Sequence, residues 1–192
     1  MPKVYVVVGI AISDTKGWTP VDPAFRTIRH GDWLVLLDPR WTADAPDGNP
    51  PASAIMGGWG LDESGAAGPF EPNPDYRPSD AATPTDPIDT VLRRAVAGEN
   101  VTDRIVPTFR DSIVHLGCDE AGEPLVGPAP DGVTCVPVVT AEVHKQRVGP
   151  VHWRKIWGGA LADIVPPDVD ILVNPGGPAQ FRLVTRALRT SE

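Results

Sequence analysis

The chain has 192 residues and a mass of 20.5 kDa, and 41% of its residues are hydrophobic, which is enough for a sizeable core. It carries 17 basic and 25 acidic residues, which gives a net charge of −8. This balance argues against nucleic acid and against an anionic membrane surface as partners, because both would repel the chain.

The acidic charge is concentrated between residues 38 and 89, where ten acidic residues stand against Arg40 and Arg77. The same stretch holds ten of the 23 prolines, so we expect a loop-rich surface region with extended segments. From residue 142 onward there are seven basic and five acidic residues. The two parts could therefore attract each other, or attract partners of opposite charge.

The two cysteines, Cys118 and Cys135, have neither the number nor the spacing of a metal site or a disulfide framework. We expect reduced, buried thiols in a cytoplasmic protein, with a disulfide between neighbouring strands left open. The apolar run at residues 4–12 lacks a small-residue cleavage site and is too short to span a bilayer. Neither export nor membrane insertion is predicted.

Residues 3–12 predict a buried strand, because valine, tyrosine and isoleucine dominate and no helical period is present. Residues 19–31 predict a short helix, with prolines near its start and a glycine at its end. Phe25 and Ile28 would share the buried face of that helix.

Two strands that pair with each other are predicted next, at residues 33–37 and 54–61. Gly57 and Gly58 in the second of them predict a bulge or a close approach of backbone. Residues 70–79 have no regular period and predict an ordered loop.

The strongest helix signal spans residues 85–98. Thr85 or Asp86 would cap it, Pro87 suits its first turn, and Gly98 would end it. Four residues would form its apolar face: Ile88, Leu92, Ala95 and Val96.

Beyond residue 101 the pattern predicts a meander of strands with helical inserts. Thr140 is expected to cap a short helix that runs through Lys145. The other predicted elements are strands at residues 111–118, 133–139 and 151–157, a helical segment at 158–164, and a closing hairpin at 169–183 around the sequence Asn-Pro-Gly-Gly-Pro.

Together these elements predict an α+β fold, mainly an antiparallel sheet with short helices packed on one side and a loop-rich, proline-containing middle segment. One compact domain over residues 1–192 is favoured, because every connecting segment contains apolar anchors. A division into an N-terminal part (1–79) and a C-terminal part (80–192) is left open.

Several of these segments resemble a known family. The sequence Asn-Pro-Asp-Tyr-Arg-Pro at residues 73–78 and Thr-Asp-Pro-Ile-Asp at 85–89 look like the signature of actinobacterial type VII secretion system-associated proteins. The C-terminal half resembles the SseB-like domain. The supporting segments are 31–39 and 57–59 in the first half, and 118–122, 136–142 and 172–176 in the second. The resemblance implies an accessory role in secretion without supplying a mechanism.

Catalytic chemistry has little support in the sequence. The histidines His30, His115, His144 and His152 are scattered without metal-ligand spacing, so neither a metal nor another cofactor is predicted. The glycines near Trp59 are better explained by strand distortion than by a phosphate-binding loop. The chain is therefore predicted not to be an enzyme. A hydrolase that pairs His115, His144 or His152 with a carboxylate is the alternative.

Exposed aromatic residues beside charges are typical anchors of protein interfaces. Most of the six tryptophans are expected in the core. However, Trp41 borders the acidic region, while Trp153 and Trp157 flank two basic residues. The predicted protein-binding residues are Trp41, Trp59, Asn73, Tyr76, Arg77, Trp153, Arg154 and Trp157.

The leading functional hypothesis is a non-enzymatic, cytoplasmic adaptor or chaperone-like accessory of a type VII secretion system. Its partner would be a secretion substrate or a component of the machinery, and a homodimer is left open. An immunity or regulatory protein for a co-encoded toxin is a second hypothesis, from a different functional class.

Overall fold

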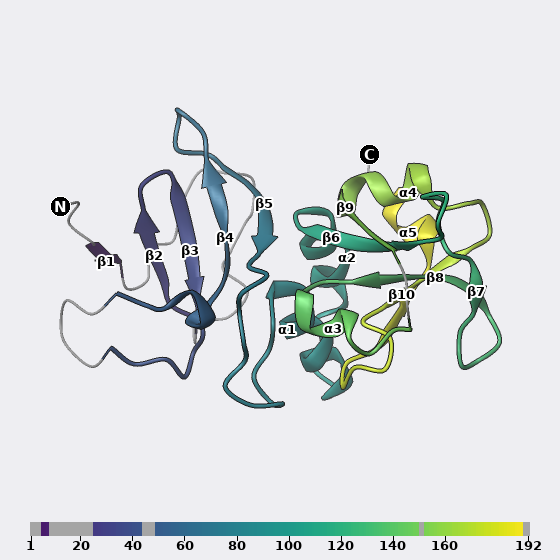
Figure 1. Ribbon diagram of the computed structural model, residues 1–192, viewed down its shortest axis with the longest axis horizontal. Helices are drawn as coiled ribbons and strands as arrows, with labels where there is room; N and C mark the ends of the chain where they lie inside the picture. Colours follow the sequence, from purple (N-terminus) through teal and green to yellow (C-terminus); the bar gives the residue numbers. More distant parts are fainter. Residues whose placement is uncertain (1–4, 8–24, 44–48, 150–151, 190–192) are drawn as a thin grey trace.

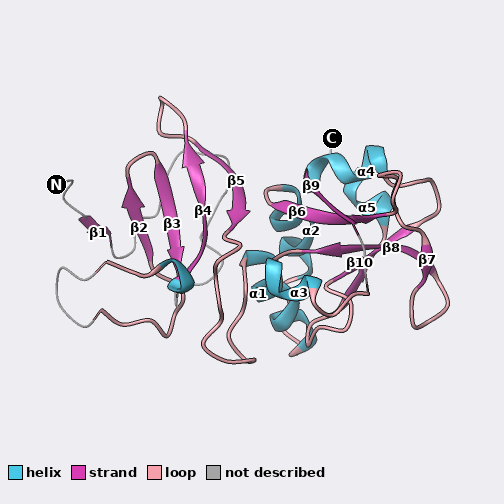
Figure 2. Ribbon diagram, in the orientation of Figure 1, coloured by secondary structure: helices cyan, strands magenta, loops and turns pink. Residues whose placement is uncertain are grey.

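The computed structural model describes residues 5–7, 25–43, 49–149 and 152–189. Two sheets lie side by side along the long axis of the molecule (Figure 1). Among the described residues, one turn of 3₁₀ helix accompanies the N-terminal sheet, whereas α-helices accompany the C-terminal sheet (Figure 2). The predicted α+β class, with mostly antiparallel strands and short helices, is confirmed.

The N-terminal sheet is an antiparallel meander in which each strand pairs with the next one in the chain. A single turn of 3₁₀ helix, η1 (Ala52–Ala54), leads into its fourth strand. The strands are β1 (Tyr5–Val7), β2 (Thr27–His30), β3 (Trp33–Leu37), β4 (Ile55–Leu61) and β5 (Ala67–Pro72).

The helix predicted at residues 19–31 is wrong where the structure describes that range. Residues Thr27–His30 form β2, which pairs with β3 so that Ile28 lies opposite Val35. Gly31, with φ of +60°, belongs to the tight turn between these strands and does not end a helix. Cross-strand pairing therefore overrides the local helix signals. Residues 8–24, which include the second half of the first predicted strand, lie outside the described residues.

The strands predicted at residues 33–37 and 54–61 are confirmed as β3 and β4, and they pair with each other. The expected distortion is present, since the register shifts between Leu36 and Leu37 and again between Trp59 and Leu61. The loop predicted at residues 70–79 begins later than expected, because β5 continues to Pro72.

The C-terminal sheet has the strand order β11-β10-β8-β6-β9, with β7 pairing to β8 beside this path. Strands β8 and β10 are parallel, and the other pairs are antiparallel. The strands are β6 (Ile113–Cys118), β7 (Gly127–Pro128), β8 (Thr134–Val139), β9 (His152–Trp157), β10 (Asp170–Val173) and β11 (Phe181–Leu183).

Four helices cover one face of this sheet: α1 (Pro87–Val96), α2 (Thr102–Arg110), α4 (Leu161–Ile164) and α5 (Thr185–Arg189). Their apolar residues form one buried core with alternate residues of the strands, such as Val114, Leu116 and Val138. Two short elements complete the fold, α3 (Glu142–Lys145) and the 3₁₀ turn η2 (Gly158–Ala160).

Helix α1 confirms the strongest helix prediction. Asp86 caps it by accepting the Asp89 N–H, and Gly98, with φ of +85°, follows its end. One predicted core residue is wrong, since Val96 is 63% exposed and Val91 is buried instead. The buried stripe follows the i, i+3, i+4 spacing from Ile88, which takes in Val91 and Leu92.

The two sheets meet where β5 passes the start of β6. The Phe70 N–H donates to the Asp111 carbonyl at 2.7 Å, and Phe70 forms a parallel bridge with Ser112. Beside this contact, Glu71 of β5 forms an ion pair with Lys155 of β9. This junction places the end of the N-terminal sheet against the first residues of β6 and the strand next to it.

Candidate protein-binding surface

The segment at residues 73–78 packs against the end of the N-terminal sheet. Tyr76 is buried, and its hydroxyl lies 3.1 Å from Asp38 Oδ2 and 3.3 Å from the Pro84 carbonyl. Burial and the neighbouring Asp38 carboxylate raise the pKa of Tyr76. The Asp38 carboxylate also accepts the Arg40 N–H at 2.8 Å. Because Asp38 follows β3 and Pro84 precedes α1, the Tyr76 hydroxyl connects the end of β3 to the loop before α1.

The segment at residues 85–89 is centred on Asp86, whose carboxylate is buried at the start of α1. Its Oδ2 accepts the hydroxyls of Thr85 and Thr140, both at 2.6 Å, and its Oδ1 accepts the Asp89 N–H at 2.9 Å. Thr140 therefore does not cap α3 as predicted, because its hydroxyl is directed to Asp86; Ala141 holds the cap position without a side-chain bond.

The turn after β10 completes this network. Asn174, buried at φ of +49°, accepts the Thr140 N–H at 3.0 Å and donates to the Thr140 hydroxyl oxygen at 2.9 Å. The glycine-rich sequence that follows β10 is thus architectural. It holds Asn174 against β8 and thereby links β8 and β10 to α1.

His144 joins the same cluster from α3, with its Nε2 at 2.9 Å from the Thr85 hydroxyl. Because the Thr85 hydroxyl donates its hydrogen bond to Asp86, the neutral imidazole of His144 donates from Nε2 to the Thr85 oxygen. The buried Nδ1 of His144 then has no hydrogen-bond partner. Burial lowers the pKa of His144, against the opposing effect of Asp86 and Asp89. Burial, followed by the charge of Asp89, raises the pKa of Asp86.

This arrangement bears directly on the hydrolase alternative. It brings His144 and a carboxylate together through Thr85, but all three side chains are buried and therefore present no reactive atom to solvent. His115 lies on β6, where it pairs with Val139 of β8, and exposed His152 begins β9.

The structure places four of the predicted binding residues in supporting positions. Trp59 is buried with Phe70, at 4.9 Å between ring centroids, so neither it nor buried Tyr76 is presented to a partner, contrary to the prediction. Asn73 donates to the carbonyls of Ala52 and Ile55, and Arg77 donates to those of Pro74 and Tyr76. Arg77 thus stabilises its own loop, and Asn73 ties that loop to η1 and to the start of β4.

Trp41 is half-buried and lies beside Arg26, whose guanidinium carbon is 5.7 Å from the ring centroid. This contact between a cation and an aromatic ring holds the loop after β3 against the approach to β2. Trp41 therefore contacts a residue of its own chain. It follows β3 of the N-terminal sheet, whereas Trp153 and Trp157 lie on β9 of the C-terminal sheet.

The face of the C-terminal sheet opposite the four helices carries the remaining aromatic residues. The register pairs Trp157 with Ile113, Lys155 with His115 and Trp153 with Gly117, and side chains paired in this way share a face. We call Ile113, His115, Trp153, Lys155 and Trp157 the open face. Trp157 is 51% exposed and Trp153 is half-buried.

The register corrects one predicted member of this surface. Arg154 lies opposite Leu116, which belongs to the helix-covered core, so it projects from the other side of the sheet. Lys155 is the basic residue between the two tryptophans, and it was absent from the prediction. Alternation along β9 could have identified it, because residues 153, 155 and 157 of a strand face the same way.

His115 lies at the centre of the open face, paired with Lys155. Burial, together with the positive charges of Lys145 and Lys155 and against the effect of Glu142, lowers the pKa of His115 to about 4. Its buried Nδ1 has no hydrogen-bond partner. The imidazole is therefore neutral near pH 7 and adds to the apolar character of this surface.

We expect His115 to make the protein less stable in acid. An unfolded histidine binds a proton near pH 6.5, whereas the folded His115 does so near pH 4. The contribution of neutral His115 to the free energy of unfolding is therefore fully present above about pH 6.5 and is lost as the pH falls from there towards 4. His115→Gln should show a smaller loss of unfolding free energy than the wild type when urea unfolding is compared at pH 7.5 and 4.5. Parallel losses in the two proteins would contradict this assignment.

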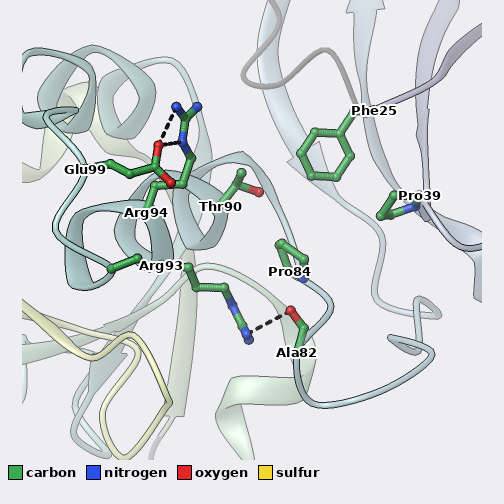
Figure 3. Close-up of a pocket in the computed structure, with 9 residues that line it drawn as sticks. Phe25, Pro39, Ala82, Pro84, Thr90, Arg93, Arg94 and Glu99 are labelled. Atoms are coloured by element: carbon green, nitrogen blue, oxygen red, sulfur yellow. Dashed lines mark hydrogen bonds and ion pairs between the residues drawn. The ribbon is translucent and has the colours of Figure 1, made fainter.

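A pocket of about 320 Å³ opens between α1 and the N-terminal part of the chain (Figure 3). Phe25, Pro39 and Pro84 give it an apolar lining. Its two arginines are engaged within the chain, Arg93 with Asp89 and the carbonyls of Ala81 and Ala82, and Arg94 with Glu99. The pocket therefore has a mainly apolar lining, and the two arginines at its edge already bind groups of the chain itself.

No group of three or more histidine, cysteine, aspartate or glutamate residues is placed to hold a metal ion within the described part of the chain. Among the same residues, no helix combines the length and apolar character needed to cross a membrane. Cys118 and Cys135 are buried, unpaired thiols, as predicted. Burial raises the pKa of each thiol.

No protein-family model, curated protein or solved structure matches the chain. Its class is therefore defined by its own architecture, a two-sheet α+β protein with an open face on the C-terminal sheet.

Proposed function

We propose that the chain is a non-enzymatic, cytoplasmic adaptor of a type VII secretion system that binds a secretion substrate or machinery component through the open face. The observation that carries the proposal is the sheet surface opposite the four core helices, where Trp153 and Trp157 lie on either side of Lys155. The resemblance of residues 73–89 to secretion-associated proteins supplies the biological setting.

The composition of the open face supports a protein partner. Tryptophan is among the residues that contribute most to interface energies, and a basic side chain between two rings adds selectivity for an acidic counterpart. Half-buried Ile113 extends the apolar surface beside the exposed ring of Trp157. The burial of His144 and Asp86 removes the most promising acid–base pair from solvent, which favours binding over catalysis.

Affinity capture from the native host tests this proposal. The immobilised wild-type protein should retain a component or substrate of the secretion system, identified by mass spectrometry. Trp157→Ala should weaken that interaction by about 30-fold, as expected for loss of an interface residue worth ~2 kcal/mol.

Trp33→Ala is the matched control, because Trp33 is a comparably exposed tryptophan, at 42%, on the other sheet. It should capture the same partner as the wild type. Failure of the folded wild type to capture any secretion component, or equal capture by Trp157→Ala and wild type, would overturn the proposal.

A further inference from the structure

Strand β9 is an edge of the C-terminal sheet. Within the described residues it pairs along its whole length with β6 and with no second strand. An edge strand presents every second residue's N–H and C=O groups away from its neighbour, where another extended chain can bind them. The outward-facing residues of β9 can be assigned from the hydrogen bonds around β6.

The Gly158 N–H donates to the Ser112 carbonyl at 2.8 Å, which marks these residues as a hydrogen-bonded pair in the β6–β9 register. Counting back by twos, Ile156 and Arg154 also direct their backbone groups to β6. On β6 the carbonyl of Gly117 turns away from β9, since it accepts the Leu125 N–H at 2.9 Å. Both observations agree with the alternation of an antiparallel pair.

The outward-facing backbone groups of β9 therefore belong to Trp153, Lys155 and Trp157. These are the same residues whose side chains form the β9 part of the open face. A strand added at this edge would form hydrogen-bonded pairs with all three. Its own side chains opposite them would lie on the open face, beside an aromatic ring, an ammonium group and a second aromatic ring.

Charge favours an acidic segment at this edge. Lys155 already holds a carboxylate, that of Glu71, and both side chains of this ion pair remain about half exposed, at 51% and 42%. A carboxylate from an added strand would lie directly opposite Lys155. It could share the Lys155 ammonium group with Glu71 or take the place of Glu71 in the ion pair. An exposed ion pair of this kind is worth little by itself, so exchange is energetically accessible.

A second copy of this chain suits the edge less well. The twofold register that uses all three outward-facing residues is centred on Lys155, which would place Lys155 opposite its own copy and each Trp153 opposite Trp157. Like charges directly opposite each other destabilise a strand pair, and lysine at an edge is a common defence against self-association.

We propose that β9 binds one extended segment of its protein partner as an additional strand, with an acidic residue opposite Lys155 and apolar residues two positions to either side. This mode of binding rests on the proposed adaptor function and specifies the chemistry of the segment recognised. The backbone of β9 supplies the hydrogen bonds, and the open face selects an alternating apolar–acidic–apolar pattern.

The capped peptide Thr-Val-Thr-Glu-Thr-Val-Thr is a direct probe, with a dye for anisotropy measurements. The wild-type protein should bind it more tightly than the same peptide with lysine in place of glutamate. Lys155→Glu should weaken the glutamate peptide by about tenfold and reverse the preference, because charge reversal replaces an attractive cross-strand pair with a repulsive one. Glu71→Gln should strengthen binding, because it frees Lys155.

Arg154→Glu is the control of equal charge change, and it should preserve the preference for glutamate because Arg154 projects from the opposite side of β9. A peptide N-methylated at its glutamate should bind far less. In the wild-type complex, hydrogen exchange should slow at the amides of Trp153, Lys155 and Trp157.

Unchanged affinity after N-methylation, an equal effect of the Arg154 and Lys155 variants, or concentration-dependent protection of β9 without peptide would overturn strand addition; the last result would identify a second copy as the occupant. Absence of peptide binding would also overturn it, while capture of a secretion component that depends on Trp157 would still support the adaptor function.

Discussion

Asp86→Ala is expected to lower the free energy of unfolding by about 3 kcal/mol, which is a large part of the stability of a typical domain. The substitution leaves the buried hydroxyls of Thr85 and Thr140 and the Asp89 N–H without their common acceptor. Each unsatisfied buried group costs about 1–3 kcal/mol. Relief of the repulsion between Asp86 and Asp89, and of the cost of burying a charge, offsets part of this loss.

Urea unfolding at pH 7 measures the effect. Asp103→Ala is the matched control, because Asp103 is an exposed carboxylate in the first turn of α2 and its loss should change stability by less than about 0.5 kcal/mol. If both substitutions gave the same small change, the Asp86 network would contribute nothing beyond an ordinary surface carboxylate.

The sequence could identify Asp86 as a helix cap, because an acidic residue before proline and an apolar run is a local signal. It could not identify the role of Asp86 between elements. The partners Thr140 and His144 are separated from this segment by 54 and 59 positions, and their own local pattern indicated a capped helix at residues 140–145. Only the tertiary fold directs the Thr140 hydroxyl to Asp86.

Strands were predictable where their residues are buried on both sides or alternate strongly. Residues 133–139 and 169–183 were assigned correctly as β8 and as the hairpin of β10 and β11. Residues 27–30 were assigned incorrectly, because prolines and a glycine around them imitate a helix start and end. The β2 strand is stabilised by pairing with β3, which is a contact that local propensity does not contain.

Much of the open face could also have been read from β9. The sequence drew attention to Trp153 and Trp157, but it grouped them with Arg154, which is adjacent in the chain. Strand geometry separates neighbours and unites alternate residues, so Lys155 joins the tryptophans and Arg154 leaves them. The contributions of Ile113 and His115 depend on the register of β6 and were not accessible from periodicity alone.

Gly57→Ala is expected to destabilise the N-terminal sheet by about 3 kcal/mol or more, because a core position without room must shift its neighbours. Gly57 has φ of +154°, which side-chain-bearing residues rarely adopt. A Cβ atom there would lie 2.3 Å from the Glu71 carbonyl oxygen and 2.5 Å from Phe70 Cζ. The carbonyl belongs to the paired strand β5, so the clash cannot be relieved by rotating a side chain.

Gly60→Ala in the same strand is the matched control. A Cβ atom at Gly60 would meet only the far edge of the Trp33 ring, at 3.9 Å. The unfolding free energy of the Gly60→Ala variant should therefore stay within about 0.5 kcal/mol of the wild-type value. Near-ultraviolet circular dichroism should report loss of the Trp59–Phe70 contact in Gly57→Ala alone.

Because β5 carries both this contact and the hydrogen bond from Phe70 to Asp111, the Gly57→Ala substitution should also loosen the junction between the sheets. Equal stability of the two alanine variants would show that β5 can move away from Gly57 at little cost, which would contradict the close approach of these strands as a source of stability.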